Sequence, residues 1–209
     1  GSGKTTLSNA ILKIHEFEEG EILFRGKDIS KIKEKELLKF RKNVQIIFQD
    51  PYASLNPLQN IYQIISEPIK FHRICLKDEV YEKCKELIND VGLNETFLSR
   101  YPHELSGGQR QRVCIARAIS VNPQVLICDE SVSALDVSIQ ATVLNLLNLL
   151  KKKYNFTYIF ISHDLSVVKY MSDKIIVLYN GKIVDYQDAD LIFEKPKDNY
   201  TKKLIKASS

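Results

Sequence analysis

The sequence predicts an α/β fold, in which a mainly parallel sheet is flanked by helices and a helical subdomain is inserted. Three observations predict it. Short apolar strands alternate with amphipathic helices along most of the chain. Between residues 51 and 100 two helical patterns follow each other with no strong strand between them. The length of 209 residues and the hydrophobic content of 44% are sufficient for a buried core.

The first part of the chain predicts two helices and two strands. A helix is expected over residues 4–14. Residues 20–28 alternate between apolar and polar side chains and end in Gly-Lys-Asp, a pattern that predicts a strand followed by a turn. A short charged helix is expected over 34–42, and the apolar run 44–48 predicts a strand that ends before Pro51. The apolar residues of the first helix share one face: Leu7, Ala10, Ile11 and Ile14.

The inserted helical region and the second half of the chain complete the pattern. Helices are expected over 60–71 and 77–91, and a third follows residue 109 and runs through Ile119. The remaining predicted elements are a strand at 125–128, a helix at 138–153, a strand at 158–161, a helix at 165–170, and strands at 174–178 and 182–186 joined by Asn180-Gly181.

Composition excludes several classes of protein. A net charge of +4 with ordinary apolar content excludes global disorder, and no run of about 20 apolar residues could span a membrane. The mixed surface charge favours no nucleic-acid partner. The four cysteines form no CxxC pair and no zinc spacing, so we expect reduced, structural thiols in a cytosolic setting.

The chain opens on a motif typical of phosphate binding. Glycines allow backbone N–H groups to approach phosphate oxygens, and the helix that follows adds its positive end. Lys4 is expected to reach the β- and γ-phosphates, and the Thr5 hydroxyl to bind Mg²⁺. The first glycine of the full motif would precede residue 1, so a chance glycine-rich turn is the alternative. The candidate nucleotide-binding residues here are Gly1, Ser2, Gly3, Lys4, Thr5 and Thr6.

A pair of carboxylates follows a buried strand. Val125–Cys128 is entirely apolar and ends in Asp129-Glu130. Strands of a parallel sheet deliver such residues to the carboxyl edge, where ligands bind. We expect Asp129 to hold Mg²⁺ through water and Glu130 to polarise an attacking water. The alternative is an ordinary strand that ends in charged residues.

Further motifs resemble those of one protein family. Leu105–Gln109 reads LSGGQ, the signature of the ATP-binding cassette (ABC) family, and the chain also resembles that family at Gln49, Ser133–Asp136 and His163. These elements occur in the order of the family between residues 1 and about 186. The resemblance implies a P-loop NTPase fold of ABC type that binds ATP and Mg²⁺.

The resemblance also implies a role for each motif. Two cassettes pack head to tail, so the signature residues Ser106, Gly107, Gly108 and Gln109 would meet the nucleotide of the second subunit, and Asp136 would contact that subunit. Glu130 is expected to act as general base, with His163 on the γ-phosphate. Gln49 would touch Mg²⁺ or the water. The implied metal ligands are Thr5, Gln49 and Asp129.

One branch of the family fits best. The chain resembles ATPase subunits of dipeptide, oligopeptide and nickel importers at residues 44–57, 101–104 and 133–140. Such importers have two ATPase subunits, and the tyrosine at position 52 is similar to the form found in the second. The implied partners are a second ATPase subunit, in a homodimer or heterodimer, transmembrane permease subunits and, indirectly, a solute-binding protein. The implied location is peripheral, on the cytoplasmic face of the membrane. Surface residues 52–71 are expected to meet the permease through a groove.

The expected domain organisation follows. We expect residues 1–209 to form a single nucleotide-binding domain, with a helical and signature subdomain at about 52–115 and the start of a C-terminal extension at about 187–209. In some relatives this extension carries an iron–sulfur cluster. No cysteine follows Cys128, so none is expected here.

The chain departs from the family pattern at two places. Ser131 stands where a proline often follows the Asp-Glu pair. The N-terminal β region, its adenine-stacking aromatic residue and the strand before the phosphate loop are expected to be missing. An inert truncated fragment is therefore one alternative. A non-transport ABC ATPase acting on DNA or the ribosome is the other, although the compact segment from Gln49 to Ser106 lacks a coiled coil or zinc module.

Overall fold

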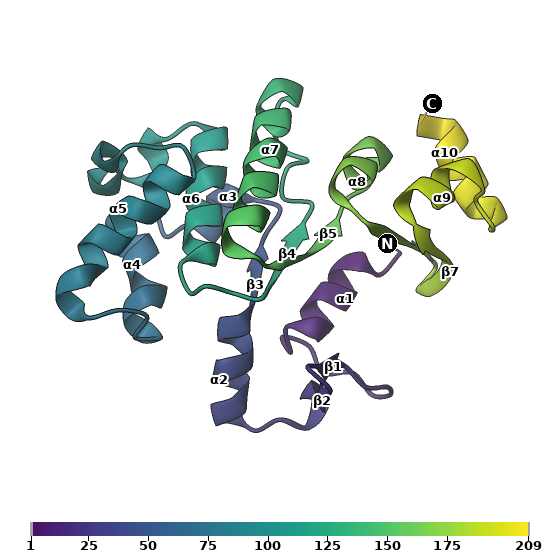
Figure 1. Ribbon diagram of the computed structural model, residues 1–209, viewed down its shortest axis with the longest axis horizontal. Helices are drawn as coiled ribbons and strands as arrows, with labels where there is room; N and C mark the ends of the chain where they lie inside the picture. Colours follow the sequence, from purple (N-terminus) through teal and green to yellow (C-terminus); the bar gives the residue numbers. More distant parts are fainter. Residues whose placement is uncertain (1, 209) are drawn as a thin grey trace. The chain divides into compact units, whose positions relative to one another are not determined.

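The computed structural model describes residues 2–208, which form two compact units (Figure 1). One unit comprises the residues up to Lys31 together with those from Phe160 onward, and the other is Ile32–Ile159. Among the described residues, no helix is both long and apolar enough to span a membrane.

A three-stranded sheet carries the predicted carboxylates. It consists of β3 (Val44–Ile47), β4 (Val125–Asp129) and β5 (Thr157–Ile161), in that spatial order. Strands β3 and β4 are parallel, and the register pairs Val44 with Val125 and Ile47 with Cys128. These strands are apolar and mostly buried, as expected for a sheet covered on both faces. The prediction of these strands is confirmed, and β3 and β4 end at the same edge.

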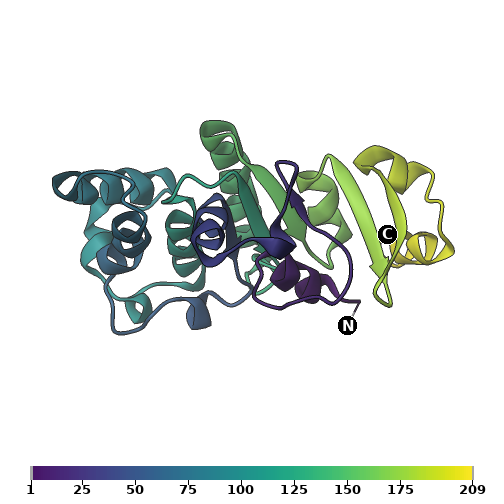
Figure 2. The same ribbon diagram turned by 90° about the horizontal axis from the view of Figure 1, so that it is seen from below.

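The helical part of Ile32–Ile159 confirms the predicted helices. It contains α2 (Glu34–Asn43), α3 (Pro51–Ser54), α4 (Ile61–Phe71), α5 (Val80–Asp90), α6 (Gly107–Ile119) and α7 (Val137–Tyr154), and the short 3₁₀ helices η2 (Lys77–Glu79), η3 (Glu95–Ser99) and η4 (Pro102–Glu104). Figure 2 shows α4, α5 and α6 gathered as a teal cluster.

Helix α4 illustrates why these segments are helical. Asn60 caps it by accepting a hydrogen bond from the Gln63 N–H at 2.9 Å, and Gln63 Oε1 accepts one from the Asn60 N–H at 2.9 Å. Its buried side chains recur at helical spacing, namely Ile61, Ile64, Ile65 and Ile69. Burial of this stripe stabilises the helix far more than its intrinsic propensity does.

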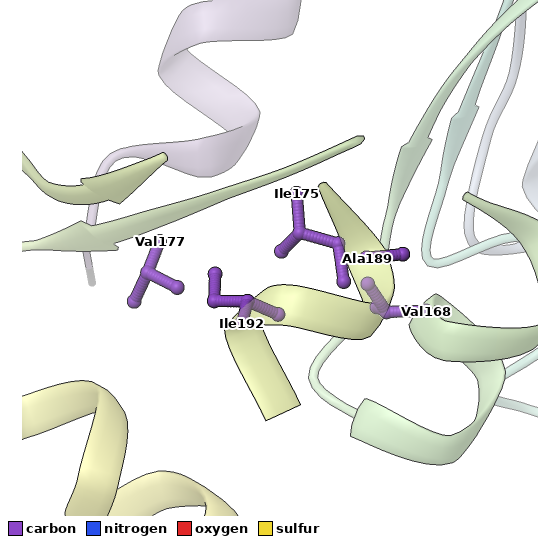
Figure 3. Close-up of a cluster of buried hydrophobic side chains, with 5 residues drawn as sticks. All are labelled: Val168, Ile175, Val177, Ala189 and Ile192. Carbon is purple, nitrogen blue, oxygen red and sulfur yellow. The ribbon is translucent and has the colours of Figure 1, made fainter. Parts of the chain in front are cut away.

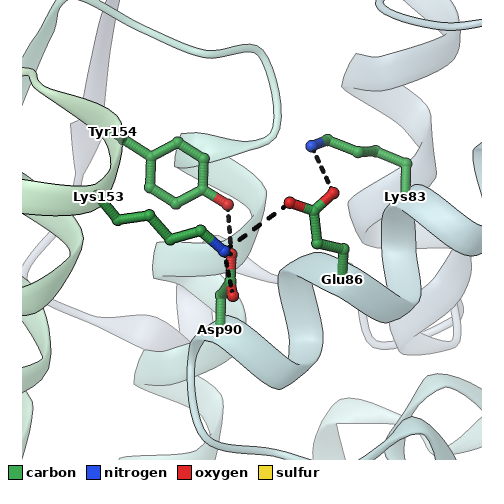
Figure 4. Close-up of polar contacts among 5 residues, drawn as sticks. All are labelled: Lys83, Glu86, Asp90, Lys153 and Tyr154. Atoms are coloured by element: carbon green, nitrogen blue, oxygen red, sulfur yellow. Dashed lines mark hydrogen bonds and ion pairs between the residues drawn. The ribbon is translucent and has the colours of Figure 1, made fainter.

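A polar cluster joins α5 to α7 (Figure 4). Both carboxylate oxygens of Asp90 accept hydrogen bonds from Lys153 Nζ at 2.6 Å, and Asp90 also accepts one from the Tyr154 hydroxyl. Glu86 lies 3.8 Å from the same ammonium and pairs with Lys83 at 2.7 Å. Burial and the Asp90 hydrogen bond raise the pKa of Tyr154, so its hydroxyl stays protonated.

The other unit contains the two ends of the chain. Its elements are α1 (Lys4–Ile11), β1 (Leu23–Phe24), β2 (Lys27–Asp28), η1 (Ile29–Lys31), α8 (Leu165–Met171), β6 (Lys174–Tyr179), β7 (Lys182–Asp188), α9 (Ala189–Glu194) and α10 (Asn199–Ser208). Figure 3 shows its core between the β6–β7 hairpin and helices α8 and α9, formed by Val168, Ile175, Val177, Ala189 and Ile192.

The structure corrects three expectations for this unit. Residues 20–28 form a hairpin of two-residue strands instead of one strand, because Arg25 and Gly26 take positive φ values of 53° and 75°. Helix α1 ends at Ile11, and its predicted apolar face is largely exposed at Leu7. Strands β6 and β7 pair antiparallel across Asn180-Gly181, which confirms the predicted hairpin turn, but they form a sheet of their own.

The cysteines are structural. All four are free, and Cys84, Cys114 and Cys128 are buried. Burial raises the pKa of the Cys128 thiol to about 12 and that of Cys114 to about 11. These thiols therefore stay protonated at neutral pH and act as small apolar side chains.

Candidate functional site

The predicted phosphate loop lies at the start of α1. Gly3 is the N-cap residue, with φ 90° and ψ 10°, a left-handed conformation that glycine adopts without strain. The Leu7 N–H donates to the Gly3 carbonyl at 3.0 Å, which closes the first turn. The earlier N–H groups of the helix have no intrahelical acceptor and can donate to an anion. Gly1 lies outside the described residues.

The side chains of this loop suit an anionic ligand. Lys4 Nζ lies 3.5 Å from Ser2 Oγ, and the first turn of α1 contains no acidic residue that would repel phosphate. Thr5 and Thr6 are exposed. A β-carbon on Gly3 would lie 3.9 Å from Gly181 Cα, in ordinary contact, so its backbone conformation rather than crowding favours glycine here.

His163 belongs to the same unit as the phosphate loop and follows β5. The next residue, Asp164, caps α8 by accepting hydrogen bonds from the N–H groups of Ser166 at 2.8 Å and Val167 at 3.3 Å. The Asp164 N–H donates to Ser162 Oγ at 3.0 Å. These bonds fix the backbone on the C-terminal side of the exposed His163 side chain.

Gln49 and Glu130 come together at the carboxyl edge of the β3–β4 pair. Each lies two residues beyond the register pair Ile47–Cys128, so parallel pairing brings both residues to one edge. Gln49 is exposed, and the segment after it is fixed because Asp50 accepts a hydrogen bond from the Tyr52 N–H at 2.7 Å and caps α3.

The backbone turns sharply after Asp129. Asp129 ends β4 and is buried, whereas Glu130 is half-buried with φ 47°, in the left-handed region that a glutamate rarely adopts. The Glu130 carbonyl accepts hydrogen bonds from the Ser133 N–H at 3.0 Å and Ser133 Oγ at 2.8 Å. Strained backbone of this kind is concentrated at functional sites, where it holds one side chain in a fixed direction.

The signature motif forms the start of α6. Ser106 caps the helix by accepting a hydrogen bond from the Gln109 N–H at 3.3 Å, and the Gln109 side chain accepts one from the Ser106 N–H at 2.9 Å. The side chain of Gln109 is thus engaged in capping. Gly107 is exposed and Gly108 is buried, so the positive end of the helix is open at Gly107.

Asp136 begins α7 at an exposed corner of the same unit. Its carbonyl accepts a hydrogen bond from the Gln140 N–H at 2.8 Å, while its carboxylate caps no N–H group of α7. The neighbouring Val137 is 84% exposed. Asp136 and Val137 are therefore exposed side by side at the start of α7.

The structure adds residues that sequence reasoning missed. Arg110, on α6, places its guanidinium 3.6 Å from the ring centroid of Tyr52, and Arg117 Nη1 donates to the Ser54 carbonyl at 2.5 Å. Helix α3, which follows Gln49, is thereby fixed to the signature helix. Spacing of seven residues puts both arginines on one helix face, but it does not identify the partner.

The chain is similar to a known family and to known proteins. Residues 1–133 match the family described as "ABC transporter". The chain is 49% identical over 209 residues to the oligopeptide transport ATP-binding protein OppF of Bacillus subtilis, and 48% identical over 206 residues to AppF of the same organism. The matches cover 99% and 98% of this chain. The chain spans about two thirds of the length of these relatives, 68% of OppF and 63% of AppF.

Solved structures share the fold. The ATP-binding cassette MJ0796, determined as a dimer in a post-hydrolysis state bound to ADP and Pi, superposes with a TM-score of 0.78 at 29% identity, covering 90% of this chain and 81% of that one. The cbiO1 protein of Clostridium perfringens, part of the transporter complex cbiONQ, gives a TM-score of 0.82 at 29% identity, covering 93% and 76%.

Proposed function

This chain belongs to the ABC transporter family, and we propose that it is the ATP-binding and ATP-hydrolysing subunit of an importer of peptides or related small solutes. The observation that carries the proposal is the placement of Gln49 and Glu130 at one sheet edge, with Glu130 in a strained backbone conformation. Several relatives that match nearly the whole chain are oligopeptide transport ATP-binding proteins, which supports peptides as the solute.

The phosphate loop would bind the nucleotide. The N–H groups of the first turn of α1 and the Lys4 ammonium would hold the phosphates, with Ser2, Gly3 and Thr6 around them. Thr5, Gln49 and Asp129 supply oxygen donors, which suit Mg²⁺, and the ion when bound would neutralise phosphate charge. The described residues contain no cluster of three or more His, Cys, Asp or Glu side chains for a metal, which fits an ion held largely by phosphate and water.

The residues of this chain would activate and orient the attacking water. Glu130 would take its proton as general base, and Gln49 would orient it. His163 would donate a hydrogen bond to the γ-phosphate. Because the transition state of phosphoryl transfer is stabilised mainly by positioning and charge, the fixed backbone at Glu130 and after His163 serves this chemistry.

A second ATPase subunit would complete the site. The start of α6 would offer the N–H groups of Gly107 and Gly108, beside Ser106, to the nucleotide held by the second subunit, and Asp136 would contact that subunit. The dimeric MJ0796 cassette, at a TM-score of 0.78, supports this arrangement. We propose that residues 1–209 act as one nucleotide-binding domain, with subdomains at about 52–115 and about 187–209.

The permease would dock on the helical side of Ile32–Ile159. A surface pocket of about 600 Å³ lies between Pro57 and Leu58 and the η4 segment that includes Tyr101 and His103. Leu58 is 85% exposed and adds an apolar side chain to a lining that also contains Arg100 and Glu104. It would receive a cytoplasmic segment of the permease and hold the subunit on the cytoplasmic face of the membrane.

The test measures ATP hydrolysis, ATP binding and peptide uptake with the protein from its complete gene, reconstituted in vesicles with its permease. Glu130→Gln should lower turnover by roughly 10²–10⁴-fold and leave ATP affinity intact. Lys4→Ala should weaken ATP binding by about tenfold or more. The controls Glu19→Gln and Lys39→Ala change the same residue types at exposed positions.

Two outcomes would overturn the proposal. Wild-type turnover in the Glu130→Gln protein would remove Glu130 from the role of general base. Normal ATP hydrolysis without ATP-dependent peptide uptake would retain the ATPase and reject the peptide importer.

A further inference from the structure

The second glycine of the signature motif lies against the first turn of α7. A β-carbon built on Gly108 would be 2.6 Å from Ile139 Cγ2, well inside van der Waals contact. The neighbouring Gly107 is different, because its β-carbon would lie 3.9 Å from Leu135 Cδ2, an ordinary contact. A side chain is therefore excluded at Gly108 by the protein itself, before any ligand is considered.

Ile139 cannot easily move away. Its Cγ2 is attached to the β-carbon of a helical residue, and a β-branched side chain in a helix has one strongly preferred χ1 rotamer. The Ile139 Cδ1 and Cβ atoms lie 3.9 Å and 4.0 Å from the same point, so rotation would bring another part of the side chain close. Relief of the clash requires the two helices to separate.

The start of α6 cannot shift along the chain either. The reciprocal hydrogen bonds between Ser106 and Gln109 fix which residue begins the helix. Ile139 follows Asp136 by three residues, within the first turn of α7. The Gly108–Ile139 contact therefore sets the spacing between Ser106–Gly108 and Asp136, the two elements that we propose to face a second subunit.

We infer that Ile139 is a positioning residue, and that packing alone requires glycine at position 108, because Ile139 occupies the space that a side chain there would need. The inference rests on the proposed function for its effect on hydrolysis. The steric clash between Gly108 and Ile139 does not depend on the proposed function, because it affects stability whether or not ATP is hydrolysed.

The experiment is a double-mutant cycle in the protein from its complete gene, with thermal unfolding and ATP hydrolysis as the two measurements. Gly108→Ala should lower the Tm by about 3–8 °C and the hydrolysis rate by about tenfold. In the Ile139→Ala background the same change should leave the Tm unchanged or raise it, and part of the hydrolysis lost in Gly108→Ala should return. Gly107→Ala is the matched control, and its Tm should not fall.

The outcomes separate this inference from the proposed function. Loss of Tm in Gly108→Ala that persists in the Ile139→Ala background would overturn the steric account. Hydrolysis that stays about tenfold low in the double variant would show that the nucleotide, and not Ile139, excludes a side chain at position 108. A wild-type protein that does not hydrolyse ATP would instead reject the proposed function, while the Tm cycle would still test the packing.

Discussion

The guanidinium of Arg110 lies over the ring of Tyr52, with its Cζ 3.6 Å from the ring centroid. Arg110 is buried on α6, and its Nε also donates to the Pro102 carbonyl at 2.7 Å. The stack joins the helix of the signature motif to α3, three residues beyond Gln49. The signature and the Gln49 segment are therefore connected within one unit.

Removal of the Tyr52 ring should loosen this connection. Tyr52→Leu is expected to lower the free energy of unfolding by roughly 0.5–2 kcal/mol, because the buried cation loses its aromatic partner. Tyr52→Phe keeps a ring and should change it by much less. Chemical denaturation checks both variants, and equal values for Leu and Phe would contradict a contribution from the ring.

Asp90 should contribute more to stability than Glu86, although both face Lys153. Asp90→Ala removes hydrogen bonds to Lys153 and to the largely buried Tyr154 hydroxyl, and should cost about 1–3 kcal/mol. Glu86→Ala removes exposed ion pairs and should cost less than about 0.5 kcal/mol. Denaturant titration measures the difference. A larger loss for Glu86 would contradict the greater contribution of Asp90.

Acid should weaken the unit that contains β7 through Asp185. Burial raises the pKa of this carboxyl, but the hydrogen bonds that it accepts, led by those from the N–H groups of Asp198 and Lys197 and joined by one from Gln187, together hold the pKa below its usual value. A depressed carboxyl pKa stabilises the folded state above the unfolded value, and the stabilisation is lost as pH falls through the folded value.

The pH dependence should therefore change in Asp185→Asn. Wild-type Tm is expected to fall as pH drops below about 4, and the variant, which lacks this carboxyl, should show a shallower decline and a lower Tm at pH 7. Asp190→Asn, an exposed change nearby, is the control. Parallel pH profiles for wild type and Asp185→Asn would show that Asp185 does not contribute.

Gln111 should be replaceable with a gain in stability. It is 1% exposed on α6, and neither side-chain Nε2 nor Oε1 has a hydrogen-bond partner among residues 2–208. Gln111→Met removes a buried amide at similar volume and should raise the unfolding free energy by roughly 1–3 kcal/mol. Gln111→Glu, of the same shape, should strongly destabilise. If Met also destabilises, the amide has a partner that matters.

The sequence predicted the helices and strands better than it predicted the contacts between them. Periodicity predicted the β3 and β4 strands and helices α4 to α7 because each buries an apolar run or stripe. At residues 20–28 the pattern predicted a strand and a turn, but not the second strand, Lys27–Asp28, that follows the reversal at Arg25 and Gly26. The motifs also located Gln49 and Glu130, whose shared edge follows from parallel pairing.

Other features depend on partners that a single segment does not reveal. Arg110 and Ile139 were missed because their importance comes from Tyr52 and Gly108, which lie far away in the sequence. The antiparallel pairing of β6 with β7 was foreshadowed by the Asn180-Gly181 turn, yet the turn alone does not say that these strands form a separate sheet.

The backbone at Glu130 has a consequence for the evolution of heat resistance. A residue with φ 47° is held where glycine or asparagine folds more readily, so glutamate is the less favourable choice for stability at this position. Laboratory selection for thermal tolerance alone is expected to replace it, and the selected proteins would lack the general base that we propose. Heat resistance and turnover therefore make opposing demands on this single residue.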